Sequence, residues 1–172
     1  MSSNASDAAE SDGEDAPPKT IHIFPGIEAF ADRILVVGEK EKPTRIPIVG
    51  SSLCMTSKVF QAMMRWKSGG VFIEAKSAEI SLPDDNADAL VILLQLAHAQ
   101  SHLVPKELDF ERLLEVTILA DKYDMMNLIE IYQDTWTKPL LTSEPLLGTV
   151  EQRFFLSWKF RKGWIRCSGF HC

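Results

Sequence analysis

Cysteine is scarce in this chain of 172 residues, and the chain has no long apolar run. Its cysteines, Cys54, Cys167 and Cys172, are too few and too unevenly spaced for a disulfide framework, which is typical of a reducing compartment. The longest apolar run, residues 89–94, is far shorter than the roughly 20 residues that a membrane-spanning helix needs. The first residues also lack the basic and apolar regions of a signal peptide. We therefore expect a soluble protein of the cytoplasm or nucleus.

Sequence signatures of catalysis and of metal binding are missing as well. There is no Gly-rich phosphate loop, nucleophile elbow or pair of catalytic carboxylates, so we expect no enzyme activity, no cofactor and no small-molecule substrate. His98 and His102 have a spacing that would point both at one metal on a helix, but no carboxylate follows His98 as in a zincin. Cys167, His171 and Cys172 offer only three ligands at the end of the chain. We predict no metal site.

Acidic residues outnumber basic ones, and the charge is distributed unevenly. The formal net charge is −6. Residues 1–20 carry five acids and one lysine, residues 142–172 carry five basic and two acidic residues, and the middle carries 17 acidic and 12 basic residues. An acidic middle segment repels phosphate groups and therefore disfavours nucleic acid as a partner. Residues 1–20 also lack large apolar side chains after Met1, so we expect them to form a disordered tail.

Apolar patterning predicts a small mixed domain over residues 21–141. Short apolar or alternating runs bounded by turn residues predict three strands, at residues 34–37, 45–49 and 79–82. The charged segment 39–43 between the first two strands ends in proline and predicts a hairpin loop. Pro47 removes a donor from the second strand and indicates an edge position in the sheet.

Helical spacing of apolar residues predicts four helices around these strands. We expect Ser51 or Ser52 to cap the first helix, residues 84–86 to cap the second and Asp109 to cap the third. The fourth should stop before Pro139. Their apolar faces are predicted to include Leu53, Val59, Phe60, Met63 and Met64; Leu90, Leu93, Leu94 and Ala97; Leu113, Leu114, Ile118 and Ala120; and Leu128, Ile129, Tyr132 and Trp136. The fold class is therefore mixed α/β (α+β), a small mixed sheet flanked by a cluster of helices.

Four segments in this order resemble the BTB/POZ family. Residues 31–38, Ala-Asp-Arg-Ile-Leu-Val-Val-Gly, look like its first strand, and residues 53–63 look like its helix with the pattern serine-x-x-phenylalanine-x-x-methionine. Residues 79–85 look like the strand and acidic cap that follow, and residues 113–125 end in the string LADKYDM. The amino-acid sequence of these segments is similar to that of short BTB proteins of filamentous fungi. One departure is that residues 47–52 read Pro-Ile-Val-Gly-Ser-Ser, where the family usually has histidine-lysine.

The resemblance implies a BTB/POZ fold over residues 21–141 and a protein–protein interaction module as the function. It implies a homodimer, with a cullin-type ubiquitin ligase or a transcriptional or signalling assembly as a further partner. Phe72 and Glu74 stand at the family's hydrophobic-x-acid element, which touches the cullin in ligase adaptors. The alternative for these two residues is a solvated loop with one anchoring phenylalanine.

The resemblance also implies candidate residues for the dimer interface. These are Asp32, Ile34, Val36, Leu53 and Phe60. Asp32 is expected either as a buried acid near the dimer centre, paired with Arg45 or Lys58, or as a surface acid that opens a strand.

The tail, residues 142–172, matches nothing in the family. It interleaves basic with aromatic residues: Arg153, Phe154, Phe155, Trp158, Lys159, Phe160, Arg161, Lys162, Trp164 and Arg166. Such a pattern can bind an anionic membrane or nucleic acid, which is the second functional hypothesis. The alternative is a C-terminal helix docked on the domain, or a poorly ordered end.

Overall fold

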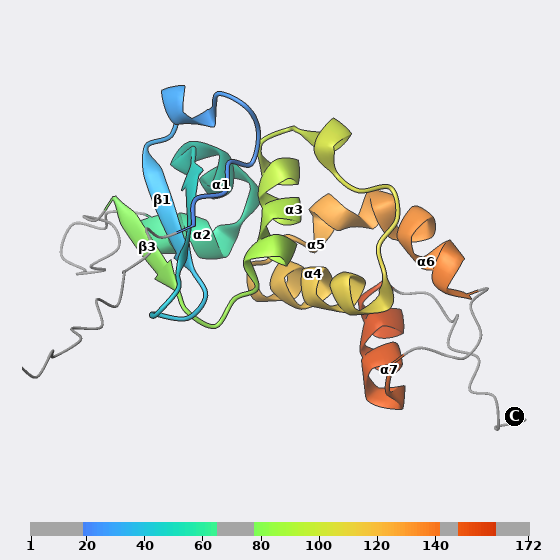
Figure 1. The fold of residues 1–172 in the computed structure, drawn as a ribbon. Coiled ribbons are helices and arrows are strands. Elements are labelled where there is room, and N and C mark those ends of the chain that lie inside the picture. Colours follow the sequence, from blue (N-terminus) through green and yellow to red (C-terminus); the bar gives the residue numbers. More distant parts are fainter. Residues whose placement is uncertain (1–18, 65–77, 142–147, 161–172) are drawn as a thin grey trace, which may run out of the picture.

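A computed structural model of the chain describes residues 19–64, 78–141 and 148–160 (Figure 1). A three-stranded sheet lies at one end of the molecule, helix α3 (Ala87–Ala97) lies in the middle, and helices α6 (Gln133–Leu141) and α7 (Val150–Lys159) lie at the other end. Among the described helices, none is long and apolar enough to cross a membrane. The mixed sheet with its cluster of helices confirms the predicted α+β class.

The sheet has the strand order β2-β1-β3. It consists of β1 (Arg33–Val37), β2 (Thr44–Ile48) and β3 (Glu79–Leu82). β1 pairs antiparallel with β2 and parallel with β3, so the predicted strands and hairpin are confirmed. Pro47 lies on the edge strand β2, where its missing N–H interrupts no ladder.

Alternation along the strands gives the sheet a core face and an outer face. The core face carries the buried residues Leu35, Val37, Ile46, Ile48, Ile80 and Leu82. The outer face carries the half-buried Ile34, Val36 and Pro47, together with an ion pair between Arg45 and Glu79. Some apolar surface of the outer face therefore remains in contact with solvent.

The remaining described helices follow the predicted order. They are α1 (Gly50–Thr56), α2 (Lys58–Met64), α4 (Phe110–Lys122) and α5 (Met126–Ile129), with short 3-10 helices η1 (Ile27–Ala29), η3 (Ser101–Leu103) and η4 (Glu130–Tyr132). Asn86 caps α3 by accepting from the N–H of Ala89, and Asp109 caps α4 by accepting from the N–H of Arg112. Both capping predictions are confirmed.

Two helix predictions were wrong in detail. Ile118 is exposed, because the buried face of α4 is centred on Leu113, Val116 and Ala120 instead. Helix α6 does not stop before Pro139 but continues through it to Leu141. Thr135 is exposed, so water can solvate the carbonyl that loses its donor at Pro139.

A buried polar network joins three of the segments that the sequence singles out. The side chain of Asp85 is 1% exposed and accepts from the Tyr123 hydroxyl and from the Lys122 ammonium. The Ser57 hydroxyl donates to the carbonyl of Tyr123 and accepts from the N–H of Phe60. The rings of Phe60 and Tyr123 stack with centroids 4.4 Å apart. These residues hold α2, the start of α3 and the end of α4 together.

Candidate functional site

Asp32 lies between η1 and β1, where its carboxylate caps helix α1. Its Oδ1 accepts from the N–H of Gly50 at 2.6 Å, and its side chain is 54% exposed. The expected partners Arg45 and Lys58 pair with other acids. In the single chain Asp32 is therefore a surface acid, its burial at a dimer centre stays a prediction, and it gains a role that the sequence did not suggest.

His98 provides a second cap for the same helix. The N–H of Val49 donates to His98 Nε2 at 3.0 Å, and His98 Nδ1 lies 2.7 Å from the carbonyl oxygen of Leu94. This arrangement requires a neutral ring with its proton on Nδ1, and burial lowers the pKa of His98 below its ordinary value. Neither Ser51 nor Ser52 caps α1, contrary to expectation, because these two long-range contacts satisfy its N-terminal end. No local spacing pattern links His98 to Val49.

The outer face of the sheet carries a shallow cavity beside Asp32. Its volume is about 360 Å3, and its lining residues are Glu28, Ala31, Asp32, Arg33, Ile34, Pro47 and Ala78. The cavity brings together Asp32 and Ile34, and Val36 follows two residues along β1 on the same face. Leu53 and Phe60 are fully buried within the one chain. Their side chains therefore offer no surface to a second copy in this conformation, and their assignment as interface residues stays a prediction.

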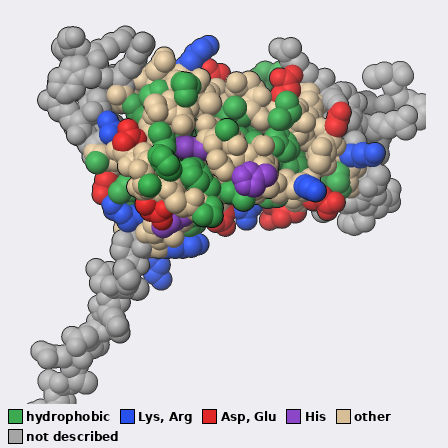
Figure 2. Space-filling model, turned by 90° about the horizontal axis from the view of Figure 1, so that it is seen from above, with side chains coloured by type: hydrophobic (Ala, Val, Ile, Leu, Met, Phe, Trp, Pro, Cys, Tyr) green, Lys and Arg blue, Asp and Glu red, His purple; other side chains and the backbone are tan. Residues whose placement is uncertain are grey.

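Two large apolar side chains are exposed in segments that lie close along the chain to residues lining this cavity. Phe30, directly after η1, is 69% exposed, and Met55 on α1 is 81% exposed. Figure 2 shows the molecule from the η1 side, where apolar side chains gather across the middle of the face and charged side chains surround them. This distribution is typical of protein-binding surfaces, which have an apolar centre and a polar rim.

Helix α7 is docked on the domain at both ends. At its start, Gly148 packs against the ring of Phe110, and at its end Lys159 forms an ion pair with Asp121. The carbonyl oxygen of Phe160 accepts from Gln133 Nε2 at 2.7 Å. Within residues 148–160, the basic-aromatic segment therefore forms the docked helix that the sequence offered as an alternative.

The side of α7 that faces away from the domain carries an apolar stripe. Val150, Phe154 and Trp158 are spaced four residues apart and are all exposed. Lys159 stacks over the ring of Trp158 at 4.4 Å and thereby restricts its position. The stripe is a second apolar surface that could contact another molecule.

Several predicted residues lie outside the described residues. These are Phe72 and Glu74 at the predicted cullin contact, and Arg161, Lys162, Trp164, Arg166, Cys167, His171 and Cys172 in the tail. In the part of the chain that the structure describes, no group of three histidine, cysteine or acidic side chains could hold a metal ion.

Comparison with protein-family models gives a match over most of the chain. Among protein-family models, that of the BTB/POZ domain matches residues 27–139, which is more than half of the chain. The matched span holds the sheet, helices α1–α5 and most of α6, and it ends before α7. No curated protein matches the sequence.

Proposed function

The chain belongs to the BTB/POZ domain family, whose members are protein–protein interaction modules, and on that premise we propose that it binds a second copy of itself. The proposed contact surface, called here the β1–α1 surface, consists of Phe30, Asp32, Ile34, Val36 and Met55. The exposure of Phe30 and Met55 is the observation that carries this proposal. A twofold axis through such a surface would bury the same apolar side chains on both copies.

The geometry around α1 supports this assignment of the contact surface. Asp32 and His98 fix the N-terminal end of α1, so the exposed Met55 is presented on a helix that is already positioned. A preordered surface loses less conformational entropy on binding than a flexible one. The cavity beside Asp32 and Ile34 leaves room for an apolar side chain of the second copy.

Charge substitution on this surface tests the homodimer. We expect Phe30→Glu combined with Met55→Glu to convert a dimer into a monomer, because both carboxylates would be desolvated at the contact. Molar mass should be measured by light scattering during size-exclusion chromatography. Ile131→Glu is the matched control, since Ile131 is 78% exposed but lies on η4. The proposal fails if the wild-type chain is monomeric at high concentration, or if only the control changes the mass.

We further propose a cullin-type ubiquitin ligase scaffold as a partner, with a transcriptional or signalling assembly as the alternative. Both are partners of the cytoplasm or nucleus, where we propose that the chain works. The support is the family membership together with Phe72 and Glu74 at the hydrophobic-x-acid element. Co-purification of a cullin that is lost in Phe72→Ala and Glu74→Ala would favour the ligase. Binding of other proteins that survives both substitutions would favour the alternative.

One observation favours the second functional hypothesis, a peripheral binder of anionic membranes. The stripe Val150, Phe154 and Trp158 places two aromatic side chains in solvent next to Lys159. Vesicles that contain phosphatidylserine should then co-sediment with the full chain and not with the variant Phe154→Ser, Trp158→Ser. If the wild-type chain stays in the supernatant at low salt, this candidate is eliminated.

A further inference from the structure

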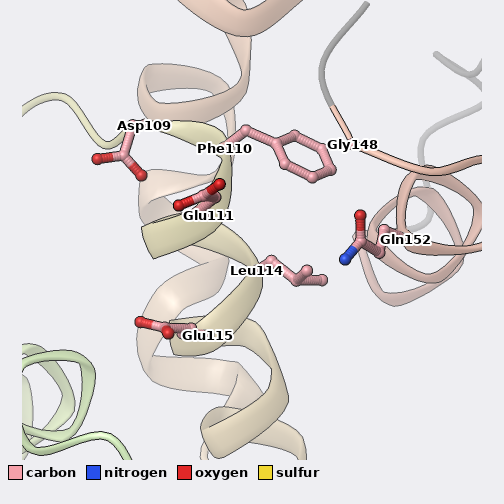
Figure 3. A pocket seen from close by; sticks show the side chains of 7 residues that line it. All are labelled: Asp109, Phe110, Glu111, Leu114, Glu115, Gly148 and Gln152. Atoms are coloured by element: carbon pink, nitrogen blue, oxygen red, sulfur yellow. The ribbon is translucent and has the colours of Figure 1, made fainter.

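A groove runs between the first half of α4 and the start of α7 (Figure 3). Its volume is about 510 Å3, and its lining residues are Asp109, Phe110, Glu111, Leu114, Glu115, Gly148 and Gln152. Phe110 and Leu114 point across the groove toward α7, whereas Glu111 and Glu115 lie along α4. We infer that this α4–α7 groove binds a segment of another protein that carries a lysine or arginine beside a large apolar side chain.

The walls of the groove are held in place before any partner arrives. Gly148 has a φ of +73°, and a Cβ atom there would overlap Cε1 of Phe110. Thr149 and Gln152 form a capping box at the start of α7, and Asp109 caps α4. The caps order each helix end and the packing of Gly148 on Phe110 joins the two, so a ligand would have less of the groove to order.

The floor of the groove can accept an apolar side chain and orient its backbone. Phe110 and Leu114 supply the apolar contact, and Leu114 is only partly buried by the rest of the chain. Gln152 Oε1 accepts from the N–H of Thr149 at 2.8 Å, which turns the amide nitrogen into the space between the helices. That nitrogen can donate to a carbonyl oxygen of a bound segment.

The charge on the rim selects a cationic partner. Glu111 and Glu115 are four residues apart on α4, and like charges at this spacing destabilise a helix. Among the described residues, neither of them forms an ion pair. A bound lysine or arginine would relieve their repulsion, whereas phosphate groups of membranes or nucleic acids would be repelled.

A cationic side chain also fits this rim better than a metal ion does. The described carboxylates here do not converge in a group of three. They lie along one helix beside an apolar floor, as suits a long side chain with an apolar stem and a charged end.

Binding of a designed peptide to the full chain tests this inference. The probe is a short fluorescein-labelled peptide of leucine, lysine and alanine, and its anisotropy is followed as protein is added. We expect Glu111→Lys combined with Glu115→Lys to weaken binding roughly tenfold or more, because two rim attractions become repulsions. A peptide with serine in place of leucine should also bind more weakly, since it lacks the apolar contact with Phe110 and Leu114.

A matched charge reversal separates this groove from the general attraction of an acidic protein. Glu39→Lys combined with Glu41→Lys changes the net charge by the same amount in the exposed β1–β2 loop. We expect this control to retain wild-type affinity at physiological salt. If both double variants weaken binding equally, or if the serine peptide binds as tightly as the leucine peptide, the groove is not the binding site. Circular dichroism of both variants shows whether they are folded.

Discussion

The hydrogen bond from Tyr123 to Asp85 predicts a specific loss of stability in the variant Tyr123→Phe. This substitution removes only the hydroxyl and keeps the ring that stacks on Phe60. Asp85 is almost fully buried, so among side-chain partners in the described part of the chain it would keep only the half-exposed Lys122. A hydrogen bond to a charged group contributes about 1.5–3 kcal/mol, and we expect the free energy of unfolding to fall by this amount.

Urea denaturation at neutral pH measures this loss. With the slope typical of a small domain, the unfolding midpoint should fall by roughly 1 M while the slope stays unchanged. The chain offers a matched control, because its only other tyrosine, Tyr132, stacks on Trp136 and its hydroxyl forms no hydrogen bond with another described residue. Tyr132→Phe should change the free energy of unfolding by less than about 0.5 kcal/mol. The reasoning is refuted if Tyr123→Phe unfolds at the wild-type urea concentration, or if both variants lose the same stability.

Three further predictions concern helix ends and turns. Burial lowers the pKa of His98 in the folded chain, so its contribution to stability is complete above its unfolded pKa of about 6.5 and is lost as pH falls toward the folded pKa. The difference between the unfolding free energies at pH 7.5 and at pH 5.5 should therefore be smaller in His98→Asn than in the wild type, and an identical difference would contradict this. Gly148→Ala should destabilise the chain by about 1–3 kcal/mol more than Gly38→Ala, because both glycines have positive φ but only Gly148 faces a ring. Equal urea midpoints of these two variants would contradict this and show that Phe110 moves aside. Asp32→Ala should cost about 0.5–2 kcal/mol through the lost cap on α1, and an unchanged melting curve would rule that role out.

Local patterns in the sequence predicted the framework of this fold. The strands, the hairpin with Pro47 on the edge, and the caps Asn86 and Asp109 were all confirmed. Each depends on residues within a few positions of one another, so spacing and residue type carry enough information. Four segments in order predicted the family, and the family model confirms it. In one of these segments, the string LADKYDM, the tyrosine and the lysine both bond to Asp85.

Predictions about burial were less accurate where more than one face of an element is apolar. Ile118 has the hydrophobicity of a core residue, yet α4 packs against α3, α5 and α7 with a different set of side chains. Leu53 and Phe60, which were also predicted for a dimer interface, fill the core of the single chain. Periodicity shows that a face is apolar, but the packing of neighbouring elements decides which part of that face is covered.

The sequence by itself determined which segments become strands and helices and to which family the chain belongs, since short-range spacing encodes both. Only the tertiary structure decided that Asp32 and His98, which are far from each other in sequence, both satisfy the start of α1. It also decided that Glu111 and Glu115 border a groove opposite Gln152. The physical reason is that a hydrogen-bond donor or a cavity wall depends on distance in space, and chain folding sets that distance through contacts between remote segments.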